Sequence, residues 1–280
     1  MSSPKPAILL AHGSYHTPQP YARLRALLSK QGYETHCPQL PCASRDYLVA
    51  DPRNPSFDQP PPSQGLPTQD LDVAALRAVL RRLVEEQGRD VLLLAHSSGG
   101  WTATEIATPE LQRGKRGLEG RGGGVVGIFY MASFLVMLGE SVWSTFAAST
   151  GEAEQGAREG QGWFSLLKER NLTVFNDPPY FLFHDLPAEE AEKWSETLTA
   201  CPFLTVPLTN DAYSELPCAY MLCEGDRVVS SWYQELMVKK AEESSGRKMQ
   251  IYKCPGGHES FLSYPELYLD SIVEFAEKCA

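Results

Sequence analysis

Several familiar signals are missing from this 280-residue sequence. No apolar run reaches the ~18 residues that a membrane-spanning helix needs. The first residues lead directly into a strand-like pattern and lack the charged head and long apolar core of a signal peptide. The net charge of −10 disfavours nucleic acid or an anionic membrane as the main partner. These absences predict a cytoplasmic protein that binds neither nucleic acid nor membranes.

Metal-binding and nucleotide-binding patterns are missing as well. The motif H-E-x-x-H does not occur, and no two cysteines have the C-x-x-C spacing. The phosphate-binding pattern G-x-x-x-x-G-K-[ST] and the pattern G-x-G-x-x-G after a strand are also absent. The seven cysteines are odd in number and scattered, which favours reduced, mostly buried thiols over a disulfide framework. We therefore expect neither a metal site nor a bound nucleotide.

The most informative stretch that is present covers residues 91–100, Val-Leu-Leu-Leu-Ala-His-Ser-Ser-Gly-Gly. Its four apolar residues predict a strand buried on both faces, and the small residues after them predict a tight turn into a helix. A serine at the apex of such a turn, here Ser97, is held in a strained conformation beyond the end of the sheet. This is the nucleophile-elbow pattern G-x-S-x-G, with Ala95 in the place of the first glycine.

Strand and helix patterns alternate along most of the chain. This alternation predicts an α/β fold with a mostly parallel central sheet flanked by helices. Residues 134–217 interrupt the alternation with helical stretches at 141–149, 164–170 and 188–197. We expect a core domain at 1–133 and 218–280 and a small helical cap insertion at 134–217. The Pro-rich segment 38–69 and the Gly-rich segment 112–124 are both predicted to be surface loops.

A serine hydroxyl is a weak nucleophile until an imidazole removes its proton, and a carboxylate orients that imidazole. His258 follows the last predicted strand, and Asp226 follows the strand before it. Carboxyl ends of parallel strands gather site residues, and the order Ser97, Asp226, His258 suits this architecture. Asp226 is our candidate acid, although Glu259, directly after His258, remains an alternative.

The carbonyl that is attacked needs donors for its developing negative charge. We expect one donor to be the backbone N–H of Ser98, at the start of the helix after the elbow. The loop after the first strand supplies the second, for which Ser14 N–H is our choice. Gly13, beside it, would let the backbone approach the substrate closely.

With these residues the chain resembles the α/β-hydrolase superfamily over nearly its whole length. Within it, the chain is most similar to the branch of plant methylesterases, hydroxynitrile lyases and their microbial relatives. The residues that carry this resemblance are the elbow, His12-Gly13-Ser14-Tyr15-His16, Phe183-His184-Asp185-Leu186-Pro187, and the stretch from His258 to Glu266, which is similar to the branch motif H-S-P-F-L-S-x-P. Two departures are Ala95 in the elbow and Glu259-Ser260 in place of Ser-Pro. The resemblance implies the α/β-hydrolase fold, no cofactor, a mostly helical cap and an apolar pocket.

Three functions are compatible with this pattern. The first is a serine hydrolase acting on an ester, lactone or thioester of a small apolar substrate through an acyl-enzyme. The second uses the same triad for C–C bond cleavage or cyclisation, and the third is a ligand receptor with little turnover. The resemblance implies that a hydroxynitrile lyase of this branch would use a cap lysine in the site. The lysines of the cap are Lys168 and Lys193, and their sequence context places neither in the site, so lyase activity is disfavoured. The residues expected to contact the substrate are Gly13, Tyr15, Trp143 and Phe146, and a homodimer is left open.

Overall fold

The protein, seen as a computed structural model, is described for residues 4–57, 59–153 and 162–279. Its centre is a six-stranded sheet with the strand order β2-β1-β3-β4-β8-β9, in which every neighbouring pair is parallel. The strands are β1 (Ala7–Ala11), β2 (Thr35–His36), β3 (Asp90–His96), β4 (Gly124–Met131), β8 (Cys218–Cys223) and β9 (Gln250–Cys254). This arrangement confirms the predicted α/β fold.

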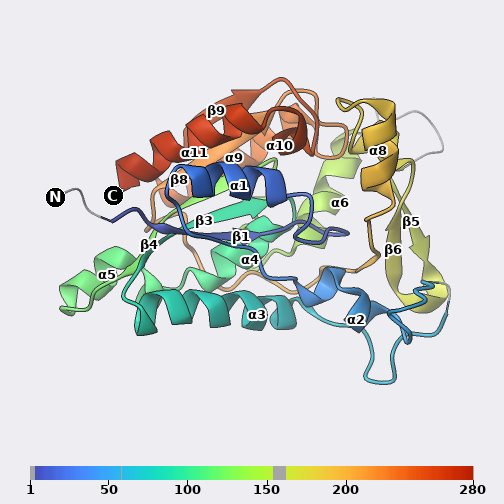
Figure 1. The fold of residues 1–280 in the computed structure, drawn as a ribbon, viewed down its shortest axis with the longest axis horizontal. Coiled ribbons are helices and arrows are strands. Elements are labelled where there is room, and N and C mark those ends of the chain that lie inside the picture. Colours follow the sequence, from blue (N-terminus) through green and yellow to red (C-terminus); the bar gives the residue numbers. More distant parts are fainter. Residues whose placement is uncertain (1–3, 58, 154–161, 280) are drawn as a thin grey trace.

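Helices cover both faces of this sheet (Figure 1). One face packs against α1 (Ala22–Lys30), α10 (Ser260–Ser263) and α11 (Pro265–Cys279). The other packs against α3 (Gln69–Arg81), α4 (Gly99–Ile106) and α9 (Ser231–Ser245). Along β1, Leu9 belongs to one of these apolar layers, whereas Ile8 and Leu10 belong to the other. Because side chains alternate across a strand, a strand covered on both faces needs a continuous apolar run.

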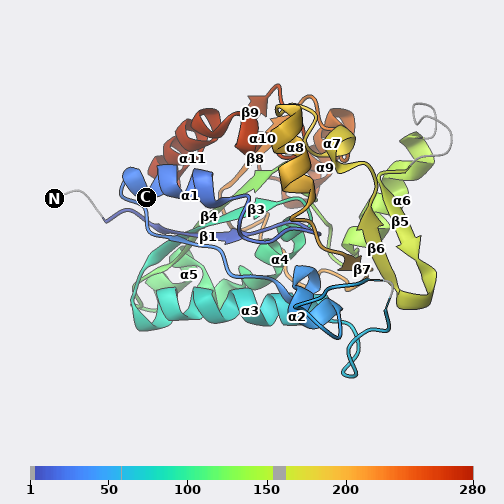
Figure 2. The same ribbon diagram turned by 45° about the vertical axis from the view of Figure 1, so that its right-hand side comes forward.

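Residues 134–217 contain the helices α6 (Val142–Ala153), α7 (Pro178–Phe181) and α8 (Ala188–Ser195). They also contain a separate antiparallel sheet of β5 (Phe164–Leu167), β6 (Leu172–Phe175) and β7 (Cys201–Pro202), which the sequence analysis did not predict. Figure 2 shows β5, β6 and β7 together at one end of the central sheet.

The predicted helix at 164–170 is therefore wrong, since its first part is strand β5 and the rest is a 3-10 turn, Lys168–Arg170. The ladder with β6 supplies the hydrogen bonds of β5, and such a partner overrides a weak local helical pattern. The helices expected near 141–149 and 188–197 are present. The division of the chain into a core and a cap at these boundaries stays a prediction.

Both predicted surface loops contain ordered, partly buried elements. Residues 38–69 include a 3-10 turn (Pro41–Ala43) and α2 (Arg45–Leu48), and the backbone N–H of Cys42 donates to the buried Asp72 carboxylate. Residues 112–124 include α5 (Arg113–Leu118), whose buried Arg116 donates to backbone carbonyl oxygens of the following turn. Specific polar contacts hold both segments, and composition alone does not reveal them.

Two further turns complete the description, a π-helical turn at Arg82–Glu86 and a 3-10 turn at Pro109–Leu111. Within the three described stretches of chain, no helix has the length and the apolar character needed to cross a membrane.

Candidate active site

The elbow between β3 and α4 has the strained geometry that its sequence predicts. Ser97 has a φ of 52°, in the left-handed region that non-glycine residues rarely occupy. A Cβ atom added to Gly99 would lie 2.3 Å from the Ala11 carbonyl oxygen, and one added to Gly100 would lie 2.3 Å from the Phe134 carbonyl oxygen. Strand and helix pass too closely here for any side chain, so both glycines are required.

Ala95, the departure from the glycine pattern, lies within β3 and pairs with Ala11 on one side and Tyr130 on the other. It is fully buried, and its methyl group is part of the apolar layer that α3 and α4 cover. The elbow therefore accommodates an alanine at this position with the turn intact.

Ser97, His258 and Asp226 form a continuous chain of hydrogen bonds. His258 Nε2 lies 3.0 Å from Ser97 Oγ, and His258 Nδ1 lies 2.7 Å from Asp226 Oδ2. An ionised carboxylate can only accept, so Nδ1 carries the hydrogen of this tautomer and Nε2 is the acceptor that faces the serine hydroxyl. The sequence placed each residue beyond the carboxyl end of a different strand, and the structure brings the three together.

Asp226 is held by three further donors. Its Oδ1 accepts from the backbone N–H groups of Val228 and Val229, each at 2.8 Å, and its Oδ2 accepts from Gln234 Nε2 at 3.0 Å. Burial alone would lower the pKa of His258, but the charge and hydrogen bond of Asp226, together with the charge of Glu259, raise it. Of the two candidate acids, Asp226 is the one that contacts a ring nitrogen of His258.

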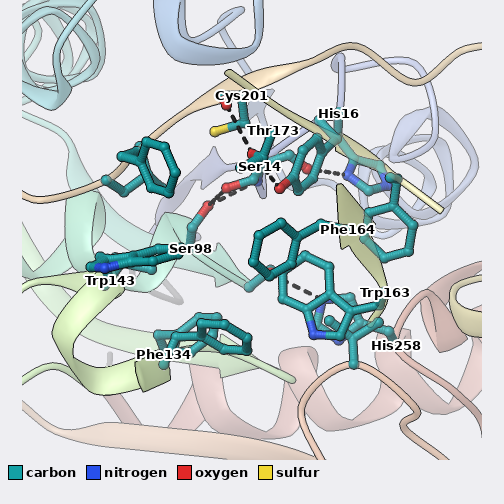
Figure 3. Close-up of a pocket in the computed structure, with 18 of the residues that line it drawn as sticks. Ser14, His16, Ser98, Phe134, Trp143, Trp163, Phe164, Thr173, Cys201 and His258 are labelled. Carbon is teal, nitrogen blue, oxygen red and sulfur yellow. Dashed lines mark hydrogen bonds between the residues drawn. The ribbon is translucent and has the colours of Figure 1, made fainter. Parts of the chain in front are cut away.

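The two residues expected to supply the oxyanion donors contact each other through the Ser98 side chain. The backbone N–H of Ser14 donates to Ser98 Oγ at 2.8 Å, and Ser14 Oγ also lies 2.8 Å from Ser98 Oγ (Figure 3). Ser14 N–H is thus directed at a hydroxyl group in this conformation. The backbone N–H of Ser98 has no acceptor among the described residues.

A pocket opens beside Ser97, Ser98 and His258 with about 620 Å³ of empty space, counting the part that is open to solvent. Its wall is mostly apolar, and its aromatic members come from the loop after β1 and from residues 134–217: Tyr15, Phe134, Trp143, Phe146, Trp163, Phe164, Phe175 and Phe203. Of the described residues that line it, none is Asp, Glu, Lys or Arg.

Three of the four expected substrate contacts, Tyr15, Trp143 and Phe146, line this pocket, but Gly13 does not. Gly13 lies behind the nucleophile instead, where an added Cβ would be 2.8 Å from Ser97 Cβ. Its small size lets the first loop approach the elbow rather than a ligand. Of the lysines considered for lyase chemistry, Lys193 is exposed on α8, and the side chain of Lys168 lies outside the described residues.

Two acidic residues near His258 make contacts that sequence reasoning did not predict. Asp185 Oδ2 accepts from the backbone N–H of Gly257 at 2.8 Å and from Ser263 Oγ at 2.7 Å, so it joins residues 134–217 to the loop of His258. Glu259 is fully buried, with Oε1 3.1 Å from His16 Nε2. The sequence analysis named Glu259 as an alternative acid, and its departure from the branch motif was a further signal that this position has a role of its own.

The sequence model of the alpha/beta hydrolase family matches residues 8–271 of this chain. Among characterised sequences, the alpha/beta hydrolase nvfD of Aspergillus novofumigatus is 29% identical over 270 residues, covering 96% of this chain and 95% of that protein. Among solved structures, the pyrethroid hydrolase from Sphingobium faniae matches with a TM-score of 0.66 at 17% identity, covering 97% of each chain. Polyneuridine aldehyde esterase matches with a TM-score of 0.68 at 16% identity, covering 97% of this chain and 99% of that one.

Proposed function

The chain belongs to the alpha/beta hydrolase family, and on this premise we propose that it is a serine hydrolase that cleaves an ester, lactone or thioester of a small apolar substrate. The observation that carries the proposal is the hydrogen-bonded chain from Ser97 Oγ through His258 to Asp226. A serine on a strained elbow, an acceptor nitrogen facing its hydroxyl and a carboxylate fixing the tautomer are the parts that nucleophilic acyl transfer needs.

In the first half-reaction, His258 Nε2 takes the Ser97 proton while Oγ attacks the substrate carbonyl carbon. The carbonyl π electrons move onto oxygen and give a tetrahedral oxyanion. This intermediate collapses to an acyl-serine, and the imidazolium of His258 protonates the departing alkoxide or thiolate. Water then attacks the acyl group in the same way, with His258 as base, and releases the acid and the free serine. Asp226 stabilises the imidazolium in both halves.

The oxyanion would be bound at the Ser14–Ser98 contact. Ser98 N–H supplies one donor. Ser98 Oγ accepts from Ser14, so its own hydrogen is free to point at the substrate oxygen, and the accepted bond polarises it. In this proposal, Ser14 N–H acts through the Ser98 hydroxyl rather than on the oxyanion itself.

The pocket favours an uncharged substrate with an aromatic or other flat apolar group. Its wall is mostly apolar, rich in aromatic rings and without Asp, Glu, Lys or Arg among the described lining residues, so burying a substrate ion there would cost a large desolvation penalty. The similarity to a pyrethroid hydrolase and to polyneuridine aldehyde esterase is consistent with ester cleavage.

The experiment uses a fluorophosphonate probe on the purified protein, with the labelled peptide located by mass spectrometry. Wild type, Ser97→Ala and His258→Ala are compared, with Ser44→Ala as a control because Ser44 is a buried serine that lies outside the pocket. We expect labelling of Ser97 in wild type and in the control, and loss of labelling in the other two.

Turnover of p-nitrophenyl esters in H₂¹⁸O then tests hydrolysis directly, because an acyl-enzyme resolved by water places one ¹⁸O in the released acid. Absence of labelling in a folded wild-type protein would overturn the proposal. Labelling without ester turnover would instead favour a different use of the same triad.

A further inference from the structure

Glu259 is a buried carboxylate that accepts no hydrogen bond from a described residue. It is fully inaccessible to solvent, and neither carboxylate oxygen forms a hydrogen bond with a described residue. Two imidazole nitrogens lie nearby, His16 Nε2 at 3.1 Å and His96 Nε2 at 3.8 Å from Oε1. A carboxyl group removed from water either takes up a proton or is stabilised as the carboxylate by a nearby positive charge, which one of these rings can supply.

His96 is not that ring. Its Nε2 lies 3.1 Å from the backbone carbonyl oxygen of His258, which can only accept, so Nε2 carries the hydrogen. Its Nδ1 lies 2.7 Å from the Tyr21 hydroxyl and accepts from it. Burial lowers the pKa of His96 to about 3, which keeps the ring neutral in this arrangement.

Both ring nitrogens of His16 lie close to oxygen atoms that can only accept a hydrogen when Glu259 is ionised. Its Nδ1 lies 2.7 Å from the carbonyl oxygen of Ser14 and therefore carries a hydrogen. Its Nε2 faces the Glu259 carboxylate. With a hydrogen on Nε2 as well, the ring is an imidazolium, which balances the carboxylate as a charge 3.1 Å away rather than through a hydrogen bond, and it is almost completely buried against this counter-charge. Burial alone would raise the pKa of Glu259, but His16, with a smaller part from His96, lowers it to about 2.

We propose that Glu259 and His16 form a buried ion pair that positions the Ser14 loop against the His258 loop and favours the protonated form of His258 during the reaction. The pair connects two segments that are far apart in the sequence: His16 holds the carbonyl group of Ser14, and Glu259 follows His258 directly. This inference rests on the proposed serine-hydrolase function. Both residues are positioning residues, because they act through Ser14 and His258.

The charged groups that face His258 can be named element by element. Asp226 comes from the loop after β8 and binds Nδ1, and Glu259 comes from the loop after β9. His96, at the end of β3, is neutral and lies with its ring centroid 4.9 Å from that of His258. His16, from the loop after β1, carries the balancing positive charge beyond Glu259. Among the described residues, loss of the Glu259 charge therefore leaves Asp226 as the anion that stabilises the imidazolium.

The spacing of His96, His258 and Glu259 would also suit a metal ion. The ring nitrogens of both histidines already have partners, however: Tyr21 and a backbone carbonyl for His96, and Asp226 and Ser97 for His258. Metal binding would break these contacts, so the ion pair is the better account of the cluster.

The test measures the rate of inactivation by a fluorophosphonate as a function of pH, which needs no knowledge of the natural substrate. In Glu259→Gln we expect the acidic limb of the profile to move to lower pH, because His258 loses an anion that favours its protonated form. The plateau rate should fall by roughly tenfold to a hundredfold, since small displacements of catalytic groups have effects of this size. Glu259→Asp should restore part of both properties.

Glu266→Gln is the matched control, because Glu266 lies seven residues further on, pairs with Arg23 at 3.4 Å and is 68% exposed. It removes the same charge from the same segment and should leave the profile unchanged. A purely structural role for Glu259 would lower thermal stability and leave the acidic limb in place, which would overturn the proposal.

His16→Gln and the double variant His16→Gln/Glu259→Gln complete the test and remain informative if Glu259→Gln does not fold. Without His16, Glu259 takes up a proton, so all three variants should have nearly the same acidic limb. If the double variant shifted the acidic limb by the sum of the two single-variant shifts, His16 and Glu259 would act independently, which would contradict a coupled pair. If the wild type itself is not labelled at Ser97, the serine-hydrolase proposal fails; if it is labelled and the variants have the wild-type profile, the ion-pair proposal fails alone.

Discussion

Ser14 donates its backbone N–H to the side-chain oxygen of Ser98 at 2.8 Å, so the two residues expected to bind an oxyanion separately are joined to each other. The hydroxyl group of Ser98 lies where the donor of the first loop would otherwise meet the substrate. Its role can be tested, because a donor and an obstruction have opposite effects on rate.

Ser98→Ala should lower kcat by about tenfold to a hundredfold with little change in KM, since an oxyanion donor acts mainly in the transition state. The measurement is steady-state kinetics on a p-nitrophenyl ester. Ser14→Ala serves as the comparison: it removes the second hydroxyl but keeps the backbone N–H, so its effect should be smaller. A rise in kcat for Ser98→Ala would mean that the hydroxyl blocks Ser14 N–H instead of extending it.

Asp226→Asn should reduce kcat by a factor on the order of 10³ to 10⁴, because an amide can donate to Nδ1 and so stabilise the wrong tautomer of His258. The fold should persist, since the amide oxygen can still accept from Val228 and Val229, the backbone donors that hold Oδ1. Glu224→Gln removes a half-exposed acid two residues away and should retain wild-type activity. Equal activity of Asp226→Asn and wild type would exclude Asp226 as the orienting acid.

The aromatic pocket leads to a prediction about specificity. Trp163 stacks on Phe175 with ring centroids 5.1 Å apart and meets Phe146 edge-on at 5.2 Å. Trp163→Ala removes this wall, so kcat/KM should fall by roughly tenfold or more for p-nitrophenyl benzoate and much less for p-nitrophenyl acetate. Trp232→Ala, at a half-exposed tryptophan outside the pocket, is the control. A proportional loss for both esters would mean that the ring supports the fold and not substrate choice.

The close passage at the elbow predicts a stability effect. Gly100→Ala should lower the free energy of unfolding by about 2 kcal/mol or more, because the new methyl group has no room beside the Phe134 carbonyl oxygen. Gly114→Ala is the comparison, since Gly114 lies in α5 with no atom within 4 Å of an added Cβ, and should gain about 0.5–1 kcal/mol. Urea denaturation of both variants measures the difference. Equal stability would show that the backbone moves apart easily.

The sequence predicted those features that a local pattern determines. Apolar runs such as that of β3 identify strands covered on both faces, and the small residues around Ser97 identify the elbow. The partners Asp226 and His258 could be named because parallel strands bring their carboxyl ends to one edge. Local information was enough for each of these.

Features that depend on a distant partner could not be predicted in this way. β5 is a strand because β6 pairs with it, and α5 is held partly by contacts of Arg116 with the following carbonyl groups. The contact of His16 with Glu259 joins residues separated by most of the chain. The interaction of Ser14 with Ser98 likewise depends on the side-chain position of Ser98, which a motif does not specify.

The buried Glu259 also predicts how stability depends on pH. Its pKa is lowered from 4.5 to about 2 in the folded protein, where burial opposes and His16 favours the charged form. A carboxyl with a lowered folded-state pKa stabilises the protein above its unfolded-state pKa, and this stabilisation is lost as pH falls towards the folded-state value.

Glu259→Gln should therefore have a lower Tm than wild type by a nearly constant amount between about pH 4.5 and pH 6, and the two Tm values should converge as the pH falls towards about 2. Thermal unfolding across this range is the measurement, with Glu266→Gln as the exposed control that should follow wild type throughout. A Tm difference that does not change between pH 6 and pH 2 would mean that Glu259 contributes by its shape and not by its charge. Convergence of the two Tm values would mean that the stabilisation needs the charged Glu259 carboxylate. It would thereby support the His16 imidazolium that balances this charge.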